Sequence, residues 1–178
     1  MSLFPEIALP EAAAPVEIIR TAEISPCGWY RYSLSRTWDE AGKTIVFIGL
    51  NPSTADASKD DRTIRRCVRF ARDNGYGRLT MLNLFAYRSA YPVVLGAQRI
   101  SRRDIVGADN DAYLRWTPGD RFIAAWGSYP AAVDRARTVI QIIGKPLDCF
   151  GTTKDGQPRH PLFIAADAPF VPFWRPNA

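Results

Sequence analysis

Four short apolar segments, each read as a buried strand, constrain the fold of this chain more than any other feature of its sequence. Segments with helical signals separate them. The apolar segments lie near residues 45–48, 79–85, 121–126 and 147–150. The helical segments lie near residues 60–74, 109–116 and 130–143, and Asp60 or Asp61 can cap the first of them. Strands that alternate with helices predict an α/β protein, a three-layer α/β/α sandwich with a mainly parallel central sheet.

The amino-terminal part of the chain has a different pattern. Residues 1–25 include several prolines and a run of alanines, and we interpret them as a loosely packed arm. Residues 26–178 then form a single domain, since the chain length suits one core. Residues 30–36 alternate at period two, as a half-buried strand does. The turn that follows predicts an amino-terminal hairpin between this strand and the strand that ends at Ile48.

Polar residues follow each of the four apolar strands. Right-handed crossovers place the carboxyl ends of parallel strands along one rim of the sheet, and open α/β sheets bind their ligands at such a rim. The polar segments are Asn51-Pro52-Ser53, Arg88-Ser89, Gly127-Ser128 and residues 152–160. The sequence therefore predicts a site at this rim.

Asn51 is the first candidate residue of that site. Gly49 ends the preceding strand, and Pro52 lacks an N–H group and cannot continue a central strand. The chain must turn here, and a short amide on a rigid turn is suited to hold one water molecule or one ligand atom. Pro52 and Ser53 would contact the same ligand. Asn-Pro is also a common turn signal, so a purely structural role stays open.

Asn83 and His160 are the other polar candidates. Asn83 lies within an apolar strand, where an unpartnered amide costs about 1–3 kcal/mol, and its donor and acceptor suit the edge of a nucleobase. His160 is the only histidine, and the prolines around it restrict a loop that could direct the imidazole to the rim. There it could donate to an anion or act as an acid. The alternatives are a structural asparagine and a histidine that only packs or faces solvent.

Basic residues indicate a negatively charged partner. The chain has 23 Lys and Arg against 18 Asp and Glu, a net charge of +5, which is compatible with a nucleic acid or a phosphorylated ligand. Arg65 and Arg66 on a predicted helix, and Arg88 after a strand, are candidates to bind phosphate. For the helical arginines the alternative is the solvated face of an amphipathic helix.

Several classes of site lack support in the sequence. We find no GxxxxGK[ST] phosphate loop, GxGxxG turn, GxSxG elbow or HExxH motif. Three scattered cysteines and one histidine do not make a zinc or iron–sulfur ligand set, so neither a metal nor a cofactor is predicted. No apolar run approaches the roughly 20 residues that cross a bilayer, and no secretion signal opens the chain. We expect a cytoplasmic protein with no membrane partner, and the sequence indicates no particular protein partner.

Taken together, the motifs resemble those of the uracil-DNA glycosylase superfamily. Gly49-Leu50-Asn51-Pro52-Ser53 is similar to the first motif of its mismatch-specific branch, and His160-Pro161 is similar to the start of the second motif, His-Pro-Ser-Pro. Leu82-Asn83-Leu84 resembles the base-reading segment of some branches. The resemblance implies that Asn51 orients the attacking water, Asn83 reads the base and His160 stabilises the departing base.

Over most of its length the chain is also similar to an uncharacterised bacterial family, domain of unknown function 1643. The segments that carry this resemblance are Asn51 to Asp56, Asp60-Asp61, Thr63 to Arg66, Asn83 to Arg88, Lys154 to Gly156 and Arg159 to Pro161. Two features depart from the glycosylases. Leu162-Phe163 stands in place of the Ser-Pro of the second motif, so the resemblance does not extend to the loop that wedges into DNA. The four-cysteine cluster site of some branches is absent.

The leading hypothesis is a nucleobase-recognising hydrolase that cleaves an N-glycosidic bond in DNA or in a nucleoside or nucleotide. Cleavage builds positive charge on the sugar and negative charge on the base, so the enzyme needs an oriented water on one side and a donor on the other. One alternative is a non-catalytic module that binds a nucleotide or nucleic acid on the same rim. Another is an enzyme of free nucleosides or nucleotides, which the departure at Leu162-Phe163 favours.

Overall fold

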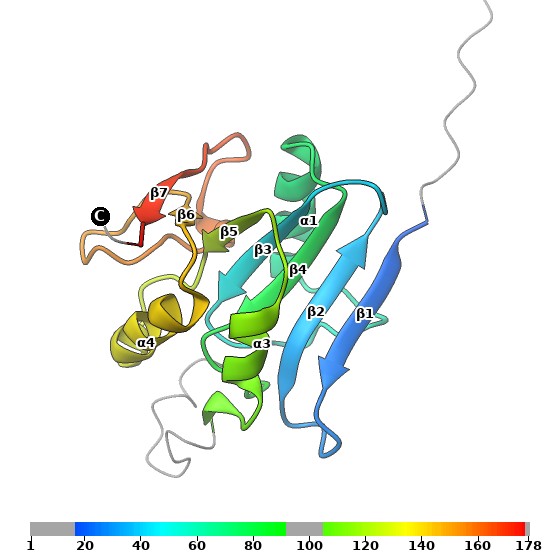
Figure 1. Cartoon of the computed structure of the whole chain (residues 1–178), viewed down its shortest axis with the longest axis horizontal. Helices are drawn as coiled ribbons and strands as arrows, with labels where there is room; N and C mark the ends of the chain where they lie inside the picture. The colour runs from blue at the N-terminus through cyan, green and yellow to red at the C-terminus, as the bar shows by residue number, and fades with distance from the viewer. Residues whose placement is uncertain (1–16, 92–104, 177–178) are drawn as a thin grey trace, which may run out of the picture.

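One seven-stranded sheet forms the centre of the computed structural model, which describes residues 17–91 and 105–176 (Figure 1). Its spatial order is β1-β2-β4-β3-β5-β6-β7. The strands are β1 (Ile19–Ile24), β2 (Arg31–Thr37), β3 (Thr44–Gly49), β4 (Arg78–Asn83), β5 (Arg121–Ala124), β6 (Leu147–Cys149) and β7 (Val171–Trp174). All four strands expected from the apolar segments are present and adjacent.

The sheet is mixed. Strands β4, β3, β5 and β6 are parallel to one another, whereas β1, β2 and β7 join them by antiparallel pairing. Three of the six pairings are therefore antiparallel, and the expected mainly parallel sheet is not confirmed for the whole molecule. The sequence analysis did not predict β7, because this strand is short and contains Pro172. A proline is tolerated here because β7 is an edge strand.

The predicted hairpin between residues 30–36 and β3 is wrong. Strand β2 pairs with β1 on one side and with β4 on the other, so β4 lies between β2 and β3. The reason is burial: Ile45 to Ile48 are fully buried, and such a continuous apolar strand belongs in the middle of a sheet between parallel neighbours. An amino-terminal hairpin does exist, but β1 and β2 form it. Strand β1 lies within residues 1–25, which we interpreted as a loosely packed arm, so the described end of that segment is part of the sheet.

The helices begin and end close to their predicted limits. They are α1 (Arg62–Asp73), α3 (Asn110–Trp116) and α4 (Val133–Ile143), with short 3-10 turns η2 (Pro130–Ala132) and η3 (Pro161–Phe163). Asp61 caps α1, because its Oδ1 accepts a hydrogen bond from the Ile64 N–H at 2.8 Å. None of the helices in the described ranges is long and apolar enough to cross a membrane.

Helices cover both faces of the sheet, and a hydrophobic core lies under each. Figure 1 shows α3 and α4 in front of the sheet and α1 behind it. Leu114, Ala136 and Val139 pack with Ile48 and Leu82 on the first face. The second core joins α1 to the opposite faces of the same strands through Ile64, Cys67, Phe70, Phe47 and Leu79. The carboxyl ends of the parallel strands are left open between these layers.

Candidate functional site

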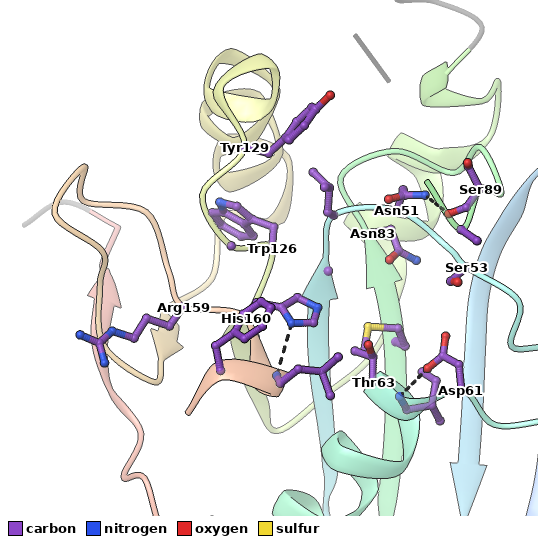
Figure 2. Close-up of a pocket in the computed structure, with 18 of the residues that line it drawn as sticks. Asn51, Ser53, Asp61, Thr63, Asn83, Ser89, Trp126, Tyr129, Arg159 and His160 are labelled. Carbon is purple, nitrogen blue, oxygen red and sulfur yellow. Dashed lines mark hydrogen bonds between the residues drawn. The ribbon is translucent and has the colours of Figure 1, made fainter. Parts of the chain in front are cut away.

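A pocket of about 700 Å³ opens at the carboxyl ends of β3, β4 and β5 (Figure 2). Four of the predicted site residues line it: Asn51 and Ser53 from the loop after β3, Asn83 from the end of β4, and His160 from the loop before η3. These side chains come from segments far apart in the sequence. The structure therefore brings the two amides and the imidazole to one pocket.

The side chain of Asn51 is fixed by the backbone around it. Its Nδ2 donates to the carbonyl oxygens of Ser89 at 2.8 Å and Pro52 at 3.0 Å. The bond to Ser89 joins the loop after β3 to the loop after β4, and the bond to Pro52 lies within the loop after β3. Because the amide nitrogen is occupied, Oδ1 is the atom left to accept a hydrogen bond, and Figure 2 shows it on the side away from Ser89. This arrangement suits the positioning of a water molecule.

Asn83 is 2% exposed, and its Nδ2 has no hydrogen-bond partner. The amide lies against the end of β3, where Gly49 leaves the room it needs: a Cβ at Gly49 would come within 2.9 Å of Asn83 Oδ1. A buried donor without a partner costs about 1–3 kcal/mol. Asn83 is thus suited to donate a hydrogen bond to an acceptor atom of a ligand.

His160 caps η3 and presents a neutral ring to the pocket. Its Nδ1 accepts the Leu162 N–H at 3.3 Å, which assigns the proton of the neutral imidazole to Nε2, on the ring edge that faces the pocket in Figure 2. Burial lowers the pKa of His160, and the nearby carboxylate of Asp61 opposes this only in part. At neutral pH His160 can therefore donate one hydrogen bond, but it does not carry a charge.

Asp61 is a pocket residue that the sequence analysis recognised only as a helix cap. One carboxylate oxygen accepts the Ile64 N–H, and the other points into the pocket (Figure 2). Asp61 is the one acidic residue among the described residues that line the pocket. Helix capping alone accounts for an aspartate at the start of a helix, so nothing in the neighbouring sequence indicated that Asp61 also lines a pocket.

Two buried arginines of β2 hold the loop that carries Asn51, Ser53 and Asp61. Arg31 donates to the carbonyl oxygen of Ala55 at 2.7 Å. Arg36, which is fully buried, donates to the Asp56 carbonyl at 2.6 Å and forms an ion pair with Asp60 at 2.7 Å. Each contact fixes a different point of this loop.

The remaining predicted residues lie around the pocket, outside the set that lines it. Pro52 is buried and supplies carbonyl contacts to Asn51 and to the Ser89 N–H. Arg65 donates to the Asp60 carbonyl at 2.8 Å. Arg66 donates to the Ile164 carbonyl at 2.7 Å and so fastens the segment after η3 to α1. For these two arginines the structure shows contacts within the protein.

Arg88 lies in a smaller hollow of about 430 Å³ next to the main pocket. The two cavities share Ser53, Ser89 and Ala90 as lining residues. One nitrogen of Arg88 donates to the Gly28 carbonyl at 3.1 Å. Trp29, whose side chain is 63% exposed, borders the same hollow. A cation and an exposed indole thus lie immediately beside the main pocket.

Within the described residues, no group of three or more His, Cys, Asp or Glu side chains is placed to hold a metal ion. The fold and site together define an α/β protein whose ligand pocket lies at the carboxyl ends of its parallel strands. The family described as "Protein of unknown function (DUF1643)" matches residues 31–162, most of the chain, and the protein belongs to this family. Comparison with curated proteins and with solved structures finds no match.

Proposed function

We propose that the protein is a nucleobase-recognising hydrolase that cleaves an N-glycosidic bond in a nucleoside, a nucleotide or DNA. The observation that carries the proposal is the meeting of Asn51, Asn83 and His160 in one pocket at the strand ends. The pocket volume falls within the range of about 300–1,000 Å³ that is usual for small-ligand sites. We also propose that sheet and helices are arranged as in uracil-DNA glycosylases; the helices on both faces and the parallel central strands support this.

In the proposed reaction the bond between the sugar C1′ and the base nitrogen breaks, and its electron pair leaves with the base. Water adds to C1′, with Asn51 Oδ1 accepting one of its hydrogen bonds. Asn83 and the His160 Nε2–H contact the edge of the base. An amide only orients water, since it is too weak a base to remove a proton. Asp61 supplies the carboxylate that takes the water proton, which ends on the departed base.

The test is the release of free base. The purified protein is incubated with nucleosides, nucleotides and oligonucleotides that carry normal and damaged bases, and the products are separated by liquid chromatography. Asp61→Asn keeps an oxygen that can cap α1 but removes the base, so release should fall by about a hundredfold or more. Asn83→Asp exchanges a donor for an acceptor and should change which base is released. Release of base at the normal rate by Asp61→Asn would remove Asp61 from the mechanism.

A second candidate is a non-catalytic module that binds a nucleotide or nucleic acid. The hollow with Arg88 and Trp29 favours it, because a phosphate contact and a stacking contact give affinity without any chemistry. A ligand that raises the melting temperature without release of base would support this function. The dependence of affinity on salt would then separate the ligands: several phosphate contacts make nucleic-acid binding fall steeply with salt, whereas a nucleoside is almost insensitive.

A further inference from the structure

Arg31 is a buried cation without an ion pair. Its side chain is 2% exposed, and no ion pair joins it to any carboxylate in the described part of the chain. Arg36, five residues further along the same strand, is equally buried but is paired with Asp60 at 2.7 Å. Buried arginines are normally paired in this way, because an unpaired charge in the protein interior is costly.

The guanidinium of Arg31 is also incompletely hydrogen-bonded. One terminal nitrogen donates to the Ala55 carbonyl, but Nε has no partner. Burial lowers the pKa of Arg31 to about 10, and the charge of Asp61 opposes this shift at a distance. The group therefore remains positively charged at neutral pH. A permanent charge with an unused donor is a feature that folding alone does not explain.

Arg31 and Asn83 line the same pocket and lack the same kind of partner. Among the described residues four buried side-chain atoms have no hydrogen-bond partner, and two of these, Arg31 Nε and Asn83 Nδ2, are atoms of residues that line this pocket. Arg31 begins β2 and Asn83 ends β4, and the two strands are neighbours in antiparallel pairing. Both unused atoms are N–H donors, so the group that satisfies them must be an acceptor.

The other cationic candidates of the pocket do not supply this charge. His160 is neutral at neutral pH because burial lowers its pKa. The side chain of Arg159 extends away from the pocket in Figure 2, and its Nε donates to the Thr152 carbonyl at 3.2 Å. Arg31 is thus the buried positive charge that lines the pocket together with the buried amide of Asn83.

We propose that Arg31 and Asn83 form a subsite for an oxygen that carries full or developing negative charge, and that the protein therefore selects bases with a carbonyl oxygen over their amino counterparts. The identity of this oxygen as that of the departing base rests on the proposed function. Its role there is to hold the charge that the base acquires when it takes the electron pair of the cleaved bond. Selection of an acceptor oxygen follows from the two donors alone.

The test uses matched pairs of free bases that differ by one exchange of oxygen for an amino group: hypoxanthine with adenine, and uracil with cytosine. Binding is measured by thermal shift and by calorimetry at millimolar base. We expect the carbonyl member of each pair to raise the melting temperature and the amino member to have a much smaller effect. Equal binding within both pairs, or no binding of either carbonyl base, would overturn the subsite.

Arg31→Met removes the charge and all N–H donors of the guanidinium at similar volume. It should weaken binding of the carbonyl bases by about tenfold to a hundredfold, as expected when a hydrogen bond to a charged group is lost. Arg137→Met, at an exposed arginine of α4, is the matched control and should bind as the unmodified protein does. Undiminished affinity in Arg31→Met would refute the assignment.

The same variant separates a ligand site from a structural role. Arg31→Met loses the hydrogen bond to the Ala55 carbonyl but no ion pair, so without ligand it should fold and melt only a few degrees below the unmodified protein. A loss as large as that expected for Arg36→Met would instead mark Arg31 as a structural arginine. Arg31→Lys keeps the charge without Nε and serves if Arg31→Met does not fold: it should bind carbonyl bases more weakly, and unchanged affinity would count against the subsite. Carbonyl-base binding that depends on Arg31, without cleavage of any N-glycosidic bond, would refute the hydrolase and leave the subsite standing.

Discussion

Replacement of Asn51 by alanine tests whether this amide is fixed by the two loops it joins. The change removes the donors to the Ser89 and Pro52 carbonyls, at 2.8 and 3.0 Å. A hydrogen bond within a protein contributes a net 0.5–1.5 kcal/mol, so the free energy of unfolding should fall by about 1–3 kcal/mol. At about 2–4 °C per kcal/mol for a chain of this size, a loss of about 2 kcal/mol lowers the melting temperature by about 4–8 °C.

The assay is urea unfolding followed by tryptophan fluorescence, and Asn74→Ala is the matched control. Asn74 also donates from its amide to a carbonyl, that of Phe70 at 2.9 Å, but it makes one such bond at the exposed end of α1. We expect the control to lose less than about 1 kcal/mol. Asn51→Asp should be at least as destabilising as the alanine variant, since a carboxylate would face both carbonyl oxygens.

The reasoning would be refuted if Asn51→Ala were no less stable than the Asn74 control. Such a result would mean that the two bonds do not hold the amide, and the orientation of Oδ1 toward a water would lose its support. If Asn51→Ala is destabilised as expected, it remains folded at 25 °C, where most proteins have about 5–15 kcal/mol of stability. Its release of free base can then be measured directly, and we expect it to be abolished.

Two further predictions concern stability. His160 has a lowered pKa, so the unfolded chain binds the proton more readily than the folded protein does. The stability that this group contributes is complete above its ordinary pKa of 6.5 and is lost as the pH falls toward the folded-state pKa. The free energy of unfolding, measured in urea between pH 5 and 7, should therefore depend less on pH in His160→Gln, and an equal pH dependence in both proteins would contradict the assignment. Arg36→Met leaves Asp60 without its buried partner and should lower the free energy of unfolding by about 3–5 kcal/mol. The control is Asp134→Ala, which breaks an exposed ion pair and should lower the free energy of unfolding by no more than about 1 kcal/mol in the same assay.

Local patterns predicted the elements that position the site. The apolar run of β3, the turn at Pro52 and the cap at Asp61 all follow from short-range preferences of the backbone, and the structure has each of them. Parallel pairing of the four apolar strands then places their carboxyl ends together. This is why the sequence alone predicts Asn51, Asn83 and His160 at one rim of the sheet.

Contacts between distant segments could not be predicted in the same way. The strand pairing that separates β2 from β3 depends on which strand is the most buried, and the helical cap explained Asp61 without any reference to the pocket. Nothing in the sequence around Arg31 indicated that it is buried, because its burial results from a distant loop that folds over β2 and accepts its hydrogen bond at the Ala55 carbonyl. The residues that sequence analysis missed are therefore those whose surroundings come from other parts of the chain.

Both edges of the sheet lie outside the segment that the family shares. Residues 31–162 include neither β1 nor β7, although they contain every described residue of the main pocket except Phe163. Arg20 of β1 pairs with Asp60, and Arg175 beyond β7 pairs with Asp148. A chain shortened to the shared segment would present two bare strand edges, which favour aggregation. Loss of activity in such a fragment would then report on its solubility, so biochemical work on this family is best done with the flanking strands retained.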